Sequence, residues 1–210
     1  GFGAINGCYS AEDIEFSAER ARGGAALVFT DAVAPTRDQQ TPVSTPLPYF
    51  DNDGQIAAYA RWVDAVHNNG AKACIQLNNA GRQTTILKRG GKPPMGPSAM
   101  SSKMVGLLPF PDSVEMTEIE IEQMILDYVL AAGRAQAAGF DAIDIDGGAG
   151  YLIQQFMSPL TNRRKDKWGG SLQNRLRFPL EIIRRTREVV GPQYPLIFDL
   201  CMDECAEGGI

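Results

Sequence analysis

The sequence predicts an α/β fold in which parallel strands are covered by helices. Short apolar runs alternate with longer segments of helical period along the 210 residues, and no internal repeat or linker marks a second domain. The strands found are about half of those in a closed (β/α)8 TIM barrel, for which about 250 residues are typical. The pattern therefore fits either an incomplete barrel or an open, doubly wound sheet, with residues 1–210 as one domain.

The first two helix–strand pairs are predicted from capping residues and apolar runs. Ser10 has the character of an N-cap residue, and the helix over 11–22 that follows it ends at a pair of glycines. The apolar run at 25–30 then predicts a buried strand. A second helix is expected over 55–68 and a second strand over 71–77.

A long irregular excursion follows the second strand. The segment 82–116 contains several glycine and proline pairs, so its backbone cannot sustain a long helix or a central strand. Thr117 and Glu120 have the spacing of a capping box, and apolar residues recur on one helical face after them. A helix is therefore predicted from this point to Gly139.

Two strands and one helix complete the predicted order. The third strand is expected over 140–146 and the fourth over 195–201. The helix between them, over 171–190, contains Pro179, which is expected to bend or shorten it because proline lacks a backbone donor.

The composition excludes several classes of partner. A net charge of −5 and a pI near 5.0 give no broad positive field for nucleic acid or anionic lipid, so a small-molecule partner is expected. No apolar run approaches the about 20 residues that cross a bilayer, and no signal-type segment opens the chain. The 4 cysteines have no C-x-x-C spacing and are expected to be free thiols. We therefore expect a cytoplasmic protein without membrane or nucleic-acid partners.

Polar side chains are predicted to gather where the strands end. Because alternate residues of a strand share a face, Asp144 and Asp146 lie opposite the apolar residues of their strand, and Asp199 does so in the last strand. Gln76 is placed in the same way at the end of the second strand. Either a ligand or neighbouring protein groups must satisfy such side chains, and the residues leave both readings open. A metal site is disfavoured because only two carboxylates meet and no histidine is near.

Several ordered runs carry a more specific signal. The segments that stand out are GYLIQQFMSP at 150–159 and NRRKDKWGGSLQNR at 162–175, supported by 139–141, 76–82, 97–99 and 18–24. Together they resemble the Old Yellow Enzyme (NADH:flavin oxidoreductase) family over nearly the whole chain, closest to its 2,4-dienoyl-CoA reductase branch. The resemblance implies a (β/α)8 TIM barrel, here incomplete with family strands 2–5 present, that holds FMN at its carboxyl-end mouth. It also implies that part of the flavin phosphate site lies in the strands that are absent.

The resemblance assigns roles to individual residues. Gln76 corresponds to the residue that bonds the flavin pyrimidine edge, and Ala32 to a small residue that lets the flavin ring approach the strand end. Tyr151 corresponds to the tyrosine that gives a proton to the substrate carbon opposite hydride attack. The alternative for Tyr151 is that it packs under its loop.

The chain departs from the family pattern at its binding positions. Asp146 and Ala149 stand where most members have a substrate-binding histidine followed by histidine or asparagine, and Asn79 replaces another histidine. Asp199 stands at the position of an arginine that contacts the flavin, so it is counted with the cofactor-binding residues. The dienoyl-CoA reductase branch also lacks the histidine pair, which favours a thioester or a bulky enone as the substrate-site ligand.

The first hypothesis for function is an ene-reductase that passes hydride from NAD(P)H through FMN to an activated alkene, such as an enoyl thioester or enone. The alternative is a catalytically degraded barrel that acts as a subunit or interaction partner. A metal-assisted lyase that uses Asp146 and Asp199 ranks third. A homo-oligomer, or a complementary subunit that supplies the missing strands, is the expected assembly. An iron–sulfur cluster is expected only outside this chain.

Overall fold

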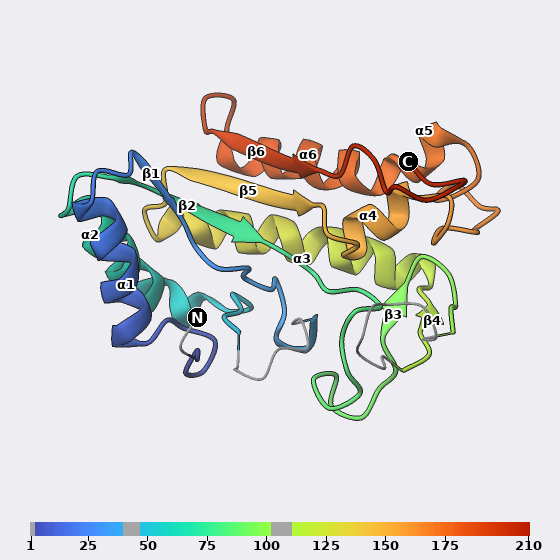
Figure 1. Ribbon diagram of the computed structural model, residues 1–210, viewed down its shortest axis with the longest axis horizontal. Coiled ribbons are helices and arrows are strands. Elements are labelled where there is room, and N and C mark those ends of the chain that lie inside the picture. The colour runs from blue at the N-terminus through green and yellow to red at the C-terminus, as the bar shows by residue number, and fades with distance from the viewer. Residues whose placement is uncertain (1–2, 40–46, 102–110) are drawn as a thin grey trace.

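Four parallel strands run through the middle of the computed structural model, which describes residues 3–39, 47–101 and 111–210 (Figure 1). They lie side by side in the order β1-β2-β5-β6, all parallel, and their bounds are Leu27–Phe29, Lys72–Leu77, Ala142–Gly147 and Leu196–Leu200. The spatial order repeats the sequence order. A doubly wound sheet instead reverses its strand order at a switch point. The open-sheet alternative is therefore wrong, and the order is that of consecutive barrel strands.

Helices pack against one face of this sheet and enclose the core. The long helices are α1 (Ala11–Arg22), α2 (Ile56–His67), α3 (Glu118–Ala137) and α6 (Arg177–Val190). Ile75, Ile143 and Ile145 point from the strands into the core, where they join buried aromatic residues such as Trp62 and Tyr128. Burial of this apolar face is the main source of stability for the fold. The other sheet face is left to the polar residues of the strand ends.

Shorter elements connect these layers. They are α4 (Leu152–Met157), α5 (Leu172–Arg175), two 3-10 turns (Arg37–Gln39 and Asp53–Gln55), and the paired two-residue strands β3 (Met95–Gly96) and β4 (Val114–Glu115). The sequence did not predict α4, because six residues are too few for a helical period, and all six are buried. The predicted excursion over 82–116 holds only β3 and β4 where it is described, and its part at 102–110 lies outside the described residues.

The predicted burial of the first strand needs correction. The run at 25–30 was expected to form a buried strand, but β1 covers only Leu27–Phe29 and lies at one edge of the sheet. Phe29 is 43% exposed, and Leu200 at the end of the other edge strand, β6, is 55% exposed. The apolar run predicted burial on both faces, whereas helices cover only one face of this sheet. Phe29 pairs with Cys74, so it lies on the other face, with Gln76 and Asp144.

The predicted effect of Pro179 is confirmed. The helical segment expected over 171–190 is broken between α5 and α6 near Leu176. Pro179 lies in the first turn of α6, where a missing backbone N–H costs no intrahelical hydrogen bond. The proline thus shortens the helix by setting where α6 begins.

The start of α3 provides a test of local stability. Thr117 Oγ1 accepts from Glu120 N at 3.2 Å, while Thr117 N donates to Glu120 Oε2 at 2.8 Å. Thr117→Ala removes the first of these bonds and leaves a helix-end N–H unsatisfied, so we expect a loss of about 1 kcal/mol in the free energy of unfolding, measured in urea. Thr117→Ser keeps the hydroxyl and is the control. Equal urea midpoints for the alanine and serine variants would contradict the capping role.

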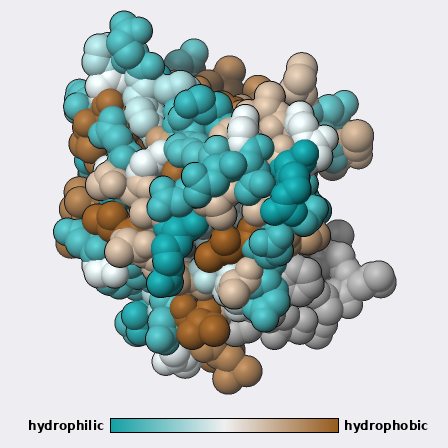
Figure 2. All heavy atoms as spheres, turned by 90° about the vertical axis from the view of Figure 1, so that its left-hand side faces the viewer, coloured by the Kyte–Doolittle hydropathy of each residue, from teal (hydrophilic) through white to brown (hydrophobic). Residues whose placement is uncertain are grey.

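The end of the molecule where the strands begin carries paired charges. Asp141 Oδ1 accepts from Lys72 Nζ at 2.7 Å, and Asp141 Oδ2 lies 2.6 Å from His67 Nε2. Figure 2 shows hydrophilic and hydrophobic side chains interspersed over this end. No helix within the three described ranges is long and apolar enough to span a membrane.

Candidate functional site

Four polar side chains leave the sheet on the face opposite the core, near the carboxyl ends of β2, β5 and β6. The parallel register pairs Gln76 with Asp144 and Asp146 with Asp199. Paired residues of neighbouring strands share a face, so the four form one group, as the sequence predicted. In a parallel sheet with helical crossovers, this end is where functional residues gather.

The amide of Gln76 lies at the centre of the group. Its Nε2 donates to Asp144 Oδ2 at 3.0 Å and to Asp199 Oδ2 at 3.4 Å. The backbone N of Gln76 donates to Thr30 Oγ1 at 3.0 Å, which ties this residue to the edge strand. Within the described residues, Gln76 Oε1 has no hydrogen-bond partner and is not buried. Gln76 therefore presents an acceptor for a ligand.

Asp144 is the most unusual of the carboxyl groups. The residue is 1% exposed, and its Oδ1 is buried without a hydrogen-bond partner among the described residues. Burial is the largest cause and raises the pKa of Asp144 to about 6; the Gln76 hydrogen bond lowers this pKa, and the charges of Asp199 and Asp146 raise it. The sequence predicted the direction of this side chain but gave it no role. The signal for its importance was the alternation with Asp146 on the same strand.

Asp146, in contrast, is fully engaged by the protein. Its Oδ2 accepts from Asn78 Nδ2 at 2.6 Å and its Oδ1 accepts from Gly148 N at 2.8 Å. Burial raises its pKa, although both hydrogen bonds lower it. Asn78 was not singled out in the sequence, and its position two residues after Gln76 on the same strand face could have indicated it.

The loop after β5 presents Ala149 and Tyr151. Ala149 has φ of 54° in the left-handed region, and Gln83 Nε2 holds the loop by donating to the carbonyls of Ala149 at 3.2 Å and Gly150 at 2.6 Å. Tyr151 caps the start of α4 and is half-buried, and burial followed by the charge of Asp146 raises the pKa of its hydroxyl. Within the described ranges that hydroxyl has no hydrogen-bond partner. The hydroxyl therefore keeps its proton at neutral pH.

Ala32 lies where the chain leaves β1 and continues beside β2. The neighbouring residue Val33 donates its N to Gln76 O at 2.8 Å and accepts from Asn78 N at 2.9 Å. Ala32 is half-buried in this connection. The structure therefore brings Ala32, Gln76, Asp146 and Asp199 to one sheet end, with Tyr151 on the adjoining loop.

The arrangement is suited to an organic ligand. In the described part of the chain, no group of three or more His, Cys, Asp or Glu side chains is arranged to hold a metal ion. A planar heterocycle with an N–H at its edge can instead donate to the open Gln76 Oε1. The side chain of Ala32 at this strand end is a single methyl group.

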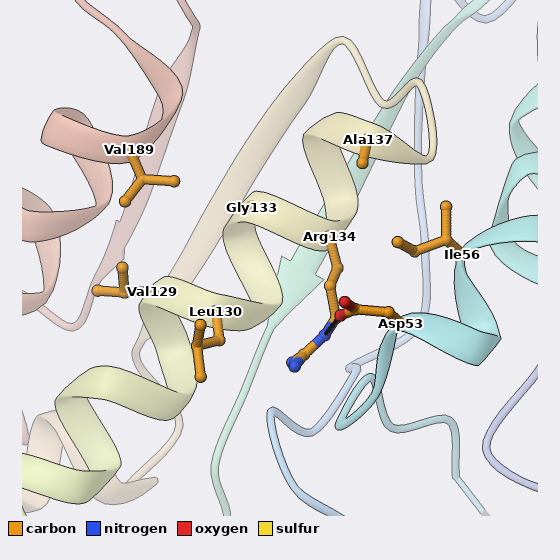
Figure 3. A pocket seen from close by; sticks show the side chains of 8 residues that line it. All are labelled: Asp53, Ile56, Val129, Leu130, Gly133, Arg134, Ala137 and Val189. Carbon is orange, nitrogen blue, oxygen red and sulfur yellow. Dashed lines mark hydrogen bonds and ion pairs between the residues drawn. The ribbon is translucent and has the colours of Figure 1, made fainter.

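A groove elsewhere on the molecule is unrelated to this group. Figure 3 shows it on the outer helical surface, where α3 faces away from the sheet towards α2 and α6. It encloses about 280 Å³ and includes the ion pair between Arg134 Nε and Asp53 Oδ1, 2.7 Å apart. It has none of the strand-end carboxyl groups in its lining, so we do not assign it to the same chemistry.

Comparisons place the chain among known proteins. The family described as "NADH:flavin oxidoreductase / NADH oxidase family" matches residues 6–210. The NADH oxidase of Thermoanaerobacter brockii is 44% identical over 204 residues, which are 97% of this chain and 31% of that protein. The solved complex of 2-naphthoyl-CoA reductase with 2-naphthoyl-CoA has a TM-score of 0.92 and 32% identity, covering 100% of this chain and 33% of that one. Old Yellow Enzyme from Pichia sp. AKU4542 has a TM-score of 0.81 and 30% identity, covering 94% and 53%.

The chain spans from about a third to about half of the length of the proteins it matches. These neighbours and the strand order confirm the predicted fold class, an incomplete (β/α)8 TIM barrel in which strands 2–5 are present.

Proposed function

The chain belongs to the NADH:flavin oxidoreductase / NADH oxidase family, and we propose that it forms part of an FMN-dependent ene-reductase. In this proposal NAD(P)H supplies a hydride that reaches an activated alkene, such as an enoyl thioester or an enone, by way of FMN. FMN is the flavin that the family implies, and when bound it supplies reversible acceptance and donation of hydride. Residues 1–210 are proposed as one partial FMN-binding TIM-barrel domain.

The observation that carries the proposal is the open acceptor on Gln76 at the strand-end mouth. Gln76 Nε2 is held by Asp144 and Asp199, so Oε1 is free to accept from the N–H of a flavin pyrimidine edge. The residues present fit this edge of the cofactor. Asp199, at the family position of an arginine, bonds Gln76 in this chain and offers no positive charge to the ligand.

Other residues of the group support the chemistry. Ala32 leaves room for the ring. Tyr151 is protonated at neutral pH, and burial raises the pKa of its hydroxyl further. We propose Tyr151 as the donor of that proton to the substrate carbon.

The substrate is proposed to be bulky. Asp146 is already satisfied by Asn78 and Gly148, and Ala149 carries only a methyl group, so neither residue grips a substrate oxygen in the family manner. A small side chain at Ala149 instead leaves space beside Tyr151. The similar 2-naphthoyl-CoA reductase is solved with a CoA thioester, which supports a thioester here.

The alternative is a degraded barrel that serves as a partner subunit, and it is motivated by Asp199, Asp146 and Ala149. It is less favoured, because the matched relatives are named as enzymes. The homo-oligomer or complementary subunit, and the cytoplasmic location, stay predictions.

The visible absorption spectrum of the purified protein tests the proposal. We expect flavin bands that co-purify with the chain, or quenching of added FMN fluorescence. Gln76→Ala should lose this flavin, because it removes the acceptor, whereas Gln173→Ala changes an exposed glutamine and should retain it. Colourless protein that leaves FMN fluorescence unchanged would overturn the proposed function.

A further inference from the structure

Two carboxyl groups on different strands accept from a single amide nitrogen. Asp144 and Asp199 both bond Gln76 Nε2, at 3.0 and 3.4 Å. Both hydrogens of Gln76 Nε2 are therefore used in hydrogen bonds. The two carboxyl groups thus fix the orientation of the Gln76 amide in which Oε1 stays open. An ionised carboxyl group has only acceptors, so it permits one orientation of the amide.

Asp144 is the buried member of this pair, and Asp199 is exposed. The titratable groups that act on Asp144 are Cys74 on β2, Asp146 on β5 and Asp199 on β6. Burial raises the pKa of the Cys74 thiol to about 12, so Cys74 is neutral. No salt bridge joins Asp144, Asp146 or Asp199 to a cation in the described ranges, unlike Asp141 at the other end of the sheet.

The environment of Asp144 makes its protonation state responsive near neutrality. Its Oδ1 has no partner among the described residues, and a buried, unsatisfied carboxylate oxygen is costly. Gln76 Nε2 donates to the other oxygen and offsets part of this cost. A protonated carboxyl group gains a donor and can bond Gln76 Oε1 instead, which would turn the amide and withdraw the acceptor from the mouth.

We propose that Asp144 is a positioning residue for the flavin: its ionised form holds Gln76 Nε2 and so directs Gln76 Oε1 to the N3–H of the ring, and protonation of Asp144 releases that orientation. The inference rests on the proposed function, and it adds a residue and a proton dependence to it. The negative charge on Asp144 also polarises the Gln76 amide, which makes Oε1 a stronger acceptor.

The direction of the pH dependence follows from linkage. The pKa of Asp144 in the free protein is about 6, and a ligand that prefers the ionised form lowers the pKa in the complex. Affinity is therefore full above this range and is lost as the pH falls through about 6. Removal of the Asp199 charge should lower the pKa of Asp144 and move the loss of affinity to lower pH.

Fluorescence quenching of riboflavin between pH 5 and 8 tests the inference. Riboflavin is used because the phosphate of FMN itself titrates near pH 6. We expect the affinity of the unaltered protein to rise about tenfold from pH 5 to pH 7. Asp144→Asn should abolish the rise, Asp199→Asn should shift it to lower pH, and the exposed control Asp64→Asn should leave it unchanged.

A flavin with a methyl group on N3 provides the matched ligand. It lacks the N–H that Gln76 Oε1 accepts, so it should bind more weakly and without the rise above pH 6. A flat pH profile for riboflavin, or the same rise for the N3-methyl ring, would overturn the inference while the proposed function stands. A protein that binds neither flavin at any pH would overturn the proposed function and, with it, the inference.

Titration of the Asp144 carboxyl carbon by 13C NMR gives a second readout without a flavin. In the ligand-free protein, its midpoint should fall when Asp199 is changed to asparagine. An unchanged midpoint would show that the two groups are not coupled and would also overturn the inference.

Discussion

Tyr151→Phe is expected to slow alkene reduction by about 10²- to 10⁴-fold, the usual contribution of a positioned general acid, and to leave flavin reduction by NAD(P)H unchanged. Tyr151 begins α4 directly after the loop from β5, and its hydroxyl has no partner within the described residues. A tyrosine hydroxyl is protonated at neutral pH and burial raises its pKa further, so Tyr151 has a proton to donate. Phenylalanine keeps the ring and removes that proton.

Stopped-flow absorbance of the bound flavin measures the two half-reactions separately. Tyr194→Phe is the matched control, because Tyr194 donates its hydroxyl to Phe140 O near the start of β5 and lies away from the strand-end mouth. It should leave both rates unchanged. Equal slowing of both half-reactions by Tyr151→Phe would remove the proton-donor role and favour a packing role for the ring.

Arg164→Met is expected to lower the free energy of unfolding by about 3 kcal/mol, because it leaves two buried carbonyl oxygens without donors. The side chain of Arg164 is 6% exposed, and one terminal nitrogen donates to Pro97 O at 2.9 Å and Met116 O at 2.6 Å. Its ion pair with Asp166 at 2.6 Å adds less, since Asp166 is 45% exposed and solvent screens the charge.

Urea denaturation measures this loss, and the adjacent exposed Arg163 supplies the control. Arg163→Met removes the same charge and should change the free energy of unfolding by less than about 0.5 kcal/mol. The two variants have equal net charge. Equal urea midpoints would therefore show that the hydrogen bonds of Arg164 to the segment 82–116 do not stabilise the protein.

The contacts of Arg164 show what the most specific sequence motif does in the structure. The run at 162–175 indicated the family, yet the residues in its first half serve structure. Asn162 Nδ2 donates to Phe156 O at 2.7 Å and Trp168 O at 2.8 Å, which closes the turn on itself. The sequence shows that these residues occur together. The carbonyl groups that their side chains bond are up to 67 residues away and are known only from the fold.

Strand periodicity predicted the candidate site more directly. Alternation with a period of two placed Asp144, Asp146 and Asp199 on one face, and the parallel register confirms this placement. The sharing of Gln76 between two carboxyl groups was not predictable, because it depends on register between strands that are far apart in the sequence. The roles of Tyr151, Ala32 and Ala149 came from resemblance and stay predictions.

The strands β1 and β6 form the two edges of the sheet, and these edges differ from each other. Within the described residues, β1 and β6 have no further strand beside them, and the outer backbone groups of β6 in one molecule are complementary to those of β1 in another, so identical chains can add in a repeating, directional manner. If the rotation between neighbours closes, the product is a ring; if it does not, growth continues into a fibre. Storage of the isolated chain at high concentration therefore carries a risk of self-association that a closed barrel avoids.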